Sequence, residues 1–376
     1  MSGGRVKKLF SIIIVGMILG VCVIFWVAYE YYWFRSEQQA KTVLERDYQA
    51  SVSAYVFTDA PGRFLGEQKF DSRELRNGRL YVPVTDIYLS ETTVDSRATK
   101  QLASFHELQM LFIEDCHIEC DAGFPPADLG RLRYLELRHT PLTDVDFLRI
   151  SQLRQLESLT LDDNGLAGDW MKHIVVLTNL RELVLNDVDL TGDATNSLPY
   201  MTGLTTLQLS HIKKDSNFAP AIARLTGLEN LVIGDTPFND SDMMYLIGLV
   251  RLEVLFLGDT EITDDGMASL RPMIKMSRLS LDNTNVGDEG LNHISKLPML
   301  SALDIRHTRA TNACLQTLSA MPLLKTVLVE GTQISKSSPG FRGVLREDVW
   351  YPEEEMGSVV HTGEEEKGTP IITAFE

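Results

Sequence analysis

The chain has 376 residues, a formal net charge of −17 and a sequence pI of about 4.9. This acidity argues against a nucleic-acid-binding protein, because such proteins need clustered Lys and Arg to displace the counterions of the phosphates. The four cysteines are too scattered for a disulfide framework. The length would suit two or three ordinary domains, but a regular repeat favours one extended domain with short additions at its ends.

An uncharged apolar run covers residues 9–29, soon after three basic residues near the N-terminus. A helix of this length spans about 31 Å, roughly the hydrocarbon thickness of a bilayer. Aromatic residues follow where a cleaved signal peptide would have a small-residue cleavage site, so a retained anchor is favoured. The sequence predicts a single-pass membrane protein with residues 1–8 in the cytoplasm and everything after the helix outside it. Gly16 and Gly20 form a G-x-x-x-G pair that could join two anchors in a homodimer.

Two short segments separate this run from the repeat. Residues 30–63 are largely polar and helix-favouring until Pro61-Gly62, and they are predicted to form a stalk. A helix lying on the membrane or on the first repeat unit is the alternative. Residues 64–83 are predicted to cap the repeat, because the terminal units of a solenoid must cover an open core.

From Val84 onward, apolar residues recur in steps of 24 without an insertion. The first position of each unit holds Val84, Leu108, Leu132, Leu156, Leu180, Leu204, Leu228, Leu252, Met276, Leu300 and Leu324. The fourth and sixth positions are also aliphatic in every unit, and the ninth is most often Thr. The pattern therefore predicts about eleven stacked units over residues 84–347.

One unit, Leu252–Lys275, shows how each is built. Leu255 and Leu257 alternate with other residues, which is the period of a strand with one buried face. Thr263-Asp264-Asp265 then supplies side chains that favour a helix start. Met267, Leu270 and Met273 recur every third residue, as on the buried side of a short helix or 3₁₀ segment. Each unit is therefore predicted to contain a strand and a helical return.

The L-x-x-L-x-L core of these units resembles the leucine-rich-repeat family. The segment Thr260–Leu270, which reads T-x-I-T-D-D-G-M-x-x-L, is most similar to bacterial and F-box-associated versions of that repeat. The resemblance implies an α/β solenoid with a parallel sheet on its concave face and short helices outside. It implies no chemistry, because the fold supports many functions.

Two segments depart from the regular pattern. In the second unit, Phe124-Pro125-Pro126 stands where the helical return is expected, and proline does not allow a helix interior to continue. Residues 348–376 contain two blocks of three glutamates among Gly, Ser, Thr and Pro. They are predicted to form a disordered acidic tail.

Strand alternation places the third, fifth and seventh positions of each unit in the hollow of the solenoid. The predicted partner-binding residues there are Tyr88, Met110, Phe112, Tyr134, Glu136, Arg138, Val232, Val254, Phe256, Arg278, Asp304 and Arg306. Two apolar patches are expected among them, because exposed apolar and aromatic clusters commonly mark binding surfaces. The N-terminal patch comprises Tyr88, Met110, Phe112 and Tyr134, and the central patch comprises Val232, Val254 and Phe256.

The eighth position of each unit ends the strand and is rich in acidic residues. Asp163, Asp187, Asp235 and Asp259 are the members of this predicted acidic lip. Since neighbouring strands lie about 4.8 Å apart, an aligned row of carboxylates could bind calcium or a basic peptide. The favoured interpretation is that each side chain hydrogen-bonds the tight turn after its strand.

No catalytic or cofactor motif is present, so an enzyme is not expected and neither is a cofactor. Cys116, His117 and Cys120 could suggest zinc. However, Cys116 occupies the inward-facing ninth position and no second ligand pair follows, so no metal is predicted.

The leading hypothesis is a membrane-anchored protein–protein interaction module displayed outside the cytoplasm, whose partners are envelope or surface proteins. One alternative is a structural or adhesive surface protein whose acidic lip binds cations or basic polymers. Another is a module that faces the cytoplasm and recruits substrates, as F-box-associated repeats do. The sequence does not identify the partner.

Overall fold

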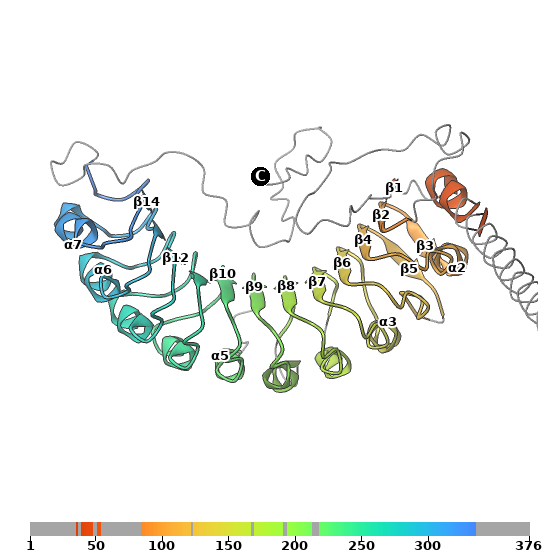
Figure 1. Ribbon diagram of the computed structural model, residues 1–376, viewed down its shortest axis with the longest axis horizontal. Helices are drawn as coiled ribbons and strands as arrows, with labels where there is room; N and C mark the ends of the chain where they lie inside the picture. The colour runs from red at the N-terminus through yellow and green to blue at the C-terminus, as the bar shows by residue number, and fades with distance from the viewer. Residues whose placement is uncertain are drawn as a thin grey trace, which may run out of the picture.

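The computed structural model describes residues 35–36, 39–47, 51–53, 84–121, 123–166, 169–190, 194–212 and 218–335. They form a curved solenoid whose sheet lines the concave side and whose helices cover the convex side (Figure 1). The predicted membrane helix (9–29), cap (64–83) and acidic tail (348–376) lie outside the described residues. Within the described ranges, no helix is long and apolar enough to cross a membrane.

The main sheet contains one strand from each of eleven units, and these strands run parallel to one another. Neighbouring strands pair with an offset of 24 residues, so that Leu207 lies opposite Leu231, which lies opposite Leu255. The strands are β2 (Asp86–Ser90), β4 (Met110–Glu114), β6 (Tyr134–Arg138), β7 (Ser158–Asp162), β8 (Glu182–Asn186), β9 (Thr206–Ser210), β10 (Asn230–Gly234), β11 (Val254–Phe256), β12 (Arg278–Ser280), β13 (Ala302–Asp304) and β14 (Thr326–Leu328). The predicted solenoid is therefore confirmed over the described units.

The aliphatic residues of the repeat form one continuous core between the sheet and the helices. Leu255 and Leu257 are fully buried, as are Met267, Leu270 and Met273 from the return segment of the same unit. The change of period within the unit therefore separates two faces that pack against each other, as the sequence predicts.

The return segments are short and many are 3₁₀ helices. They are α2 (Ser96–Leu102), α3 (Asp144–Ile150), η2 (Trp170–His173), α4 (Ala194–Ser197), η3 (Leu198–Tyr200), α5 (Ala219–Ile222), η4 (Asp242–Leu246), η5 (Asp264–Leu270), α6 (Asp288–Ile294), η6 (Asn312–Cys314) and α7 (Leu315–Ser319). Thr263 caps η5 by accepting a hydrogen bond from the amide of Asp265, as expected. The second unit has no helix among its described residues, and Phe124 fills the core there instead.

In the last four units, the threonine at the ninth position holds the turn after the strand. The hydroxyl groups of Thr260, Thr284, Thr308 and Thr332 each donate a hydrogen bond of 2.6–2.7 Å to the carbonyl oxygen three residues earlier. Because a buried hydroxyl without a partner would be destabilising, this bond explains how a Thr is accommodated at the inward-facing position of these four units. Cys116 takes the same position and is buried, as predicted.

Aspartates at the thirteenth position link successive units in the C-terminal half. The Asp240 carboxylate accepts hydrogen bonds from the amides of Thr263 (2.9 Å) and Gly266 (3.1 Å) in the next unit. Asp264 likewise accepts hydrogen bonds from the amides of Gly287 and Gly290, and Asp288 accepts one from the amide of Thr311. These carboxylates satisfy N–H groups at helix starts that have no partner within the helix. We call this series the aspartate ladder.

The N-terminal edge of the sheet is covered by residues that the sequence assigns to a stalk. Strand β1 (Ser51–Ser53) pairs antiparallel with β2. Residues 39–47 are helical, and Ala40 and Leu44 are buried in the common core. Asp47 also forms an ion pair with Arg97 of α2, at 3.1 Å. This part of the 30–63 segment therefore packs on the first repeat unit, which is the alternative arrangement, and does not form a free stalk.

Candidate functional site

The N-terminal patch lies on three neighbouring strands of the concave face. Tyr88 lies opposite Phe112 in the sheet, and Met110 lies opposite Tyr134. Tyr88 and Tyr134 are each 37% exposed, whereas Met110 and Phe112 are half-buried. The structure therefore brings these four residues together, as predicted, with two aromatic rings accessible from the hollow.

The carboxylate of Glu114 lies at the border of this patch and contacts Tyr88. The Tyr88 hydroxyl group donates a hydrogen bond to the side chain of Glu114 on the adjacent strand. Burial, and then Glu114, raise the pKa of Tyr88 above its usual value. The phenol is therefore neutral at physiological pH and acts as a hydrogen-bond donor beside an apolar surface.

Glu136 and Arg138 form an ion pair at the edge of the N-terminal patch. The Arg138 Nε atom lies 2.5 Å from the Glu136 carboxylate. Arg138 is only 7% exposed, and burial raises the pKa of Glu136. The two predicted binding residues thus compensate each other's charge within the sheet.

The expected exposure of the central patch is wrong. Val254 is 8% exposed and Phe256 is 6% exposed, and Val232 is half-buried. Phe256 stands between Val232 and Ser280 on the neighbouring strands. Because strands are only about 4.8 Å apart, side chains at equal positions cover one another, and a large ring loses most of its accessible surface.

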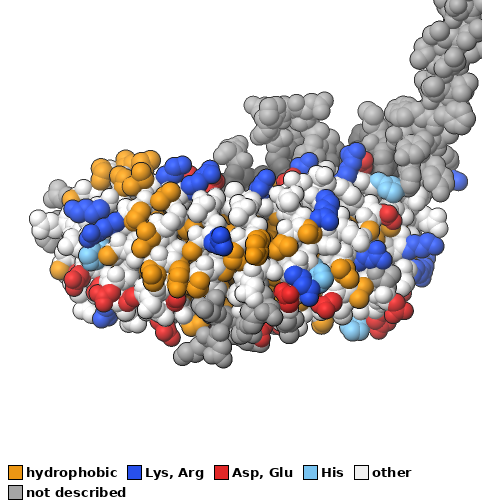
Figure 2. All heavy atoms as spheres, turned by 90° about the horizontal axis from the view of Figure 1, so that it is seen from below, with side chains coloured by type: hydrophobic (Ala, Val, Ile, Leu, Met, Phe, Trp, Pro, Cys, Tyr) orange, Lys and Arg blue, Asp and Glu red, His pale blue; other side chains and the backbone are white. Residues whose placement is uncertain are grey.

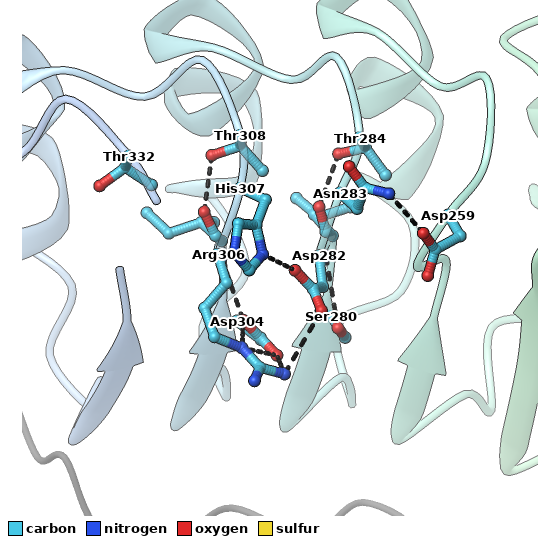
Figure 3. Close-up of polar contacts among 12 residues, drawn as sticks. Asp259, Ser280, Asp282, Asn283, Thr284, Asp304, Arg306, His307, Thr308 and Thr332 are labelled. Carbon is cyan, nitrogen blue, oxygen red and sulfur yellow. Dashed lines mark hydrogen bonds and ion pairs between the residues drawn. The ribbon is translucent and has the colours of Figure 1, made fainter. Parts of the chain in front are cut away.

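The C-terminal concave residues form a polar network. Asp304 is 1% exposed and accepts hydrogen bonds from Nε (3.0 Å) and Nη2 (2.7 Å) of Arg306, which also lies 3.5 Å from Asp282 (Figure 3). The hydrogen bonds to Asp304 raise the pKa of Arg306. His307 Nδ1 lies 3.1 Å from the other oxygen of Asp282. Arg278, the remaining predicted concave residue, is half-buried on β12.

The choice of residues at the eighth position, which includes the acidic lip, follows from the backbone conformation there. All ten non-glycine residues at the eighth position have a positive φ between 41° and 55°. They are Glu91, Asp115, His139, Asp163, Asp187, His211, Asp235, Asp259, Asn283 and His307, and Gly331 follows with a φ of 70°. Asp, Asn, His and Gly are the residues that enter this left-handed region most readily.

This result corrects the favoured interpretation of the lip. No backbone amide of a described residue donates to the side chains of Asp163, Asp187, Asp235 or Asp259. Instead, Asp235 lies 3.2 Å from Nε2 of His211, and Asp259 accepts a hydrogen bond from Asn283. The restricted choice of residue types at this position was the signal in the sequence for a left-handed turn.

One group in the described part of the chain has the composition of a metal site. Ligand atoms of Glu114, Asp115 and His139 lie within 4.8 Å of one another. His139 Nδ1 lies 3.3 Å from Asp115, so the two also form an ion pair when the imidazole is protonated. The group supplies two carboxylates and one imidazole, which is one ligand fewer than a closed tetrahedral site requires.

The two edges of the solenoid carry opposite charge. We call the eighth to fifteenth positions of the units, which follow each strand, the exit edge. The twentieth position to the second position of the next unit forms the entry edge. The described exit edge has twenty Asp and Glu residues and two Arg residues, whereas the described entry edge has five acidic and ten basic residues. Figure 2 shows this separation on the convex face, with Lys and Arg toward the upper border and Asp and Glu toward the lower one.

Comparison with solved structures identifies the fold. An internalin (InlF) from Listeria monocytogenes has a TM-score of 0.50 and 18% identity, over 74% of this chain and 93% of that one. The mouse RP105/MD-1 complex has a TM-score of 0.46 and 19% identity, over 68% and 47% of the two chains. A plant peptide hormone receptor, RGFR1 in complex with RGF2, has a TM-score of 0.40 and 18% identity, over 67% and 44%.

No curated protein sequence matches the chain. A family model described as a leucine-rich repeat region, however, matches residues 89–349, which is more than half of the sequence. The matched region begins in β2 and extends beyond β14, so it includes nearly the whole of the main sheet. On this match and on the geometry of its units, the chain belongs to the leucine-rich-repeat family.

Proposed function

We propose that this chain is a protein-binding module, held in a membrane by residues 9–29 with its solenoid outside the cytoplasm. The single observation that carries the binding function is the N-terminal patch. Tyr88 and Tyr134 present accessible rings in the hollow, and Met110 and Phe112 lie between them. Aromatic residues and Met are enriched at the centres of protein interfaces, where they contribute much of the binding energy.

The chemistry around the patch suits a partner with an apolar anchor and a basic group. Glu114 lies beside the aromatic rings and is half-buried, and Asp115 follows it at the lip. Arg138 lies opposite Glu114 on the neighbouring strand and is paired with Glu136. A cation on the partner would meet the carboxylates of Glu114 and Asp115 next to the apolar contact.

Site-specific crosslinking tests the patch. A photoreactive phenylalanine analogue replaces Tyr134 in the full chain in cells, and attached proteins are identified by mass spectrometry. The matched control carries the analogue at Tyr200, which is 73% exposed but lies on the entry edge. We expect a distinct adduct at position 134 that is lost when Phe112 is changed to Ala. The same adducts at both positions, or none at 134, would show that the patch does not bind a protein.

Protease treatment of intact cells tests the topology separately. With the solenoid outside the cytoplasm, added protease removes it and leaves a short membrane-protected fragment. A solenoid that stays intact until the cells are lysed would overturn the proposed location. It would favour the cytoplasmic substrate-recruiting alternative, while leaving the crosslinking result valid.

A second candidate function is binding of cations or basic polymers along the exit edge. Two observations favour it: the excess of carboxylates on that edge, and the group formed by Glu114, Asp115 and His139. Calorimetric titration of the full chain with calcium tests it. A Glu114→Gln/Asp115→Asn variant is expected to lose the heat of binding. The absence of heat in the unchanged protein would rule out calcium binding as the function of this edge.

A further inference from the structure

The entry edge beside strands β10 to β14 combines exposed aliphatic side chains with basic ones. Val250 is 49% exposed, Ile274 60%, Met299 50% and Leu323 42%. They occupy the twenty-third or twenty-fourth position of four consecutive units, so they follow one another along the edge. Single exposed apolar residues are common on protein surfaces, but a row at one place in successive repeats forms a continuous feature.

Basic residues accompany every part of this row. They are Arg251, Arg271, Lys275, Lys296 and Lys325, all exposed, and Glu229 and Glu253 are the acidic residues of the same described stretch. Arg251 is paired with Glu229 at 3.2 Å. Lys275, Lys296 and Lys325 form no ion pair with a described residue. Figure 2 shows hydrophobic and basic side chains side by side at the upper left, over the C-terminal units.

The shape of the solenoid makes this edge a broad, even face. The curvature of the sheet lies in the plane of Figure 1, so the two edges face toward and away from the viewer of that figure. Equivalent positions of consecutive units therefore approach a flat surface together, whereas the concave and convex faces are curved.

We propose that the entry edge beside β10 to β14 docks on the surface of an anionic lipid bilayer. Lysine ammonium groups attract anionic headgroups, and aliphatic side chains enter the boundary between headgroups and acyl chains. A second copy of the chain fits this edge less well. Symmetric pairing would place the same lysines against each other, because a two-fold interface brings one patch against itself.

Docking of this kind orients the molecule. With the entry edge on the bilayer, the acidic exit edge points away from the anionic headgroups, and the concave face opens parallel to the membrane. This inference does not depend on the proposed protein partner, nor on residues 9–29 being an anchor, because it concerns only the edge of the solenoid.

Amide hydrogen exchange of the full chain tests the proposal. The protein is mixed with vesicles of phosphatidylcholine alone and with vesicles of an equal mixture of phosphatidylcholine and phosphatidylglycerol. We expect exchange in segments 247–251, 271–275 and 295–299 to slow only on the mixed vesicles. Residues 259–265, on the exit edge of the same region, are expected to exchange equally fast on both.

Two variants with the same change in charge separate a local surface from general electrostatics. Lys275→Glu/Lys296→Glu alters the entry edge, and Lys100→Glu/Lys172→Glu alters exposed lysines of the convex return segments. Each lysine near an anionic surface contributes roughly fivefold in affinity. The first variant is therefore expected to lose the slowing, and the second to keep it.

Three results would overturn the proposal. One is equal exchange of these segments on the two kinds of vesicle, and another is an equal loss in both variants. The third is slowing that appears without lipid as the protein concentration rises, which would identify a second copy of the chain as the occupant of the edge. Ile274→Ser/Met299→Ser leaves the charge unchanged and removes apolar contact, and it is expected to weaken the slowing on the mixed vesicles.

Discussion

Asp264 and Gly290, from neighbouring units, are joined by a hydrogen bond in which the glycine amide donates to Oδ1 of the carboxylate at 2.9 Å. A Cβ atom at position 290 would lie 2.6 Å from that oxygen and 2.8 Å from Cγ1 of Val286. The aspartate ladder therefore requires a residue without a side chain at this place. Gly266 has the same relationship to Asp240 one unit earlier.

We predict that Gly290→Ala lowers the free energy of unfolding by about 1–3 kcal/mol, because a methyl group there forces apart a packed joint between units. Urea denaturation of the full chain followed by circular dichroism measures the change. Gly248→Ala is the control, since no atom lies within 4 Å of an added Cβ at that glycine. It is expected to change the free energy of unfolding by less than about 0.5 kcal/mol. Equal effects would disprove the steric requirement.

The left-handed eighth position gives a second prediction. Asp259 has a φ of 55°, which a β-branched residue adopts only with strain. Asp259→Val is expected to lower the free energy of unfolding by about 1–3 kcal/mol, whereas Asp259→Gly is expected to be neutral or slightly stabilising. The melting temperatures of both variants provide the measurement. Similar losses in both would mean that the carboxylate, and not the backbone conformation, is what the position requires.

A third prediction concerns the buried carboxylate of the C-terminal network. Asp304→Asn removes the charge that pairs with Arg306 while keeping the size of the side chain. We expect a loss of about 1–3 kcal/mol in the free energy of unfolding, because a partly buried guanidinium loses its nearer counter-charge and keeps only that of Asp282, at 3.5 Å.

The double variant Asp304→Asn/Arg306→Met is expected to recover part of that loss, since both members of the ion pair are then absent. Asp265→Asn, at an exposed carboxylate, serves as the control. A double variant that is less stable than Asp304→Asn alone would show that Arg306 contributes through its packing rather than through this pair.

Asp86 makes the stability dependent on pH. Burial raises the pKa of this carboxyl group to about 6 in the folded chain, and the hydrogen bond from Thr85 only partly opposes the shift. The folded state therefore holds a proton that the unfolded state has released. The resulting stabilisation is fully present below the unfolded pKa and is lost as the pH rises through about 6.

Accordingly, Asp86→Asn is expected to stabilise the protein at neutral pH by at most about 3 kcal/mol. At a pH of about 4 the difference from the unchanged protein is expected to be small, because the carboxyl group is then protonated in the folded state. Urea denaturation at the two pH values measures it. A difference of the same size at both would show that the charge of Asp86 is not the cause.

The repeat could be predicted from the sequence because each inward position must hold a side chain of the same kind, and this requirement recurs in all eleven predicted units. Leu255, Leu257 and Thr260 are buried in the places their periodicity indicates. The N-terminal patch could be predicted for the same reason, since alternation along a strand determines which side chains enter the hollow. Tyr88 and Tyr134 are accessible there.

Exposure and conformation were harder to predict. The low accessibility of Phe256 depends on its neighbours across the sheet, and the sequence of one strand does not contain them. The sequence favours side-chain hydrogen bonds as the reason for the acidic lip, whereas the structure shows a backbone angle shared by Asp259, His307 and Gly331. The entry edge does not stand out in the sequence, because Val250 and Ile274 lie outside the strand and helix periods and next to the core positions Leu249 and Met273.

The aspartate ladder has a consequence for how such a chain changes length. Asp240, Asp264 and Asp288 each bind the start of the following return segment in the same register. If a whole unit such as Leu252–Lys275 were removed, Asp240 would meet Gly290 in the geometry it now has with Gly266. Duplication of that unit would likewise create a joint of a kind already present. In this half of the solenoid, the gain or loss of one whole unit during evolution would therefore change the length of the arc while keeping the same kind of contact between units.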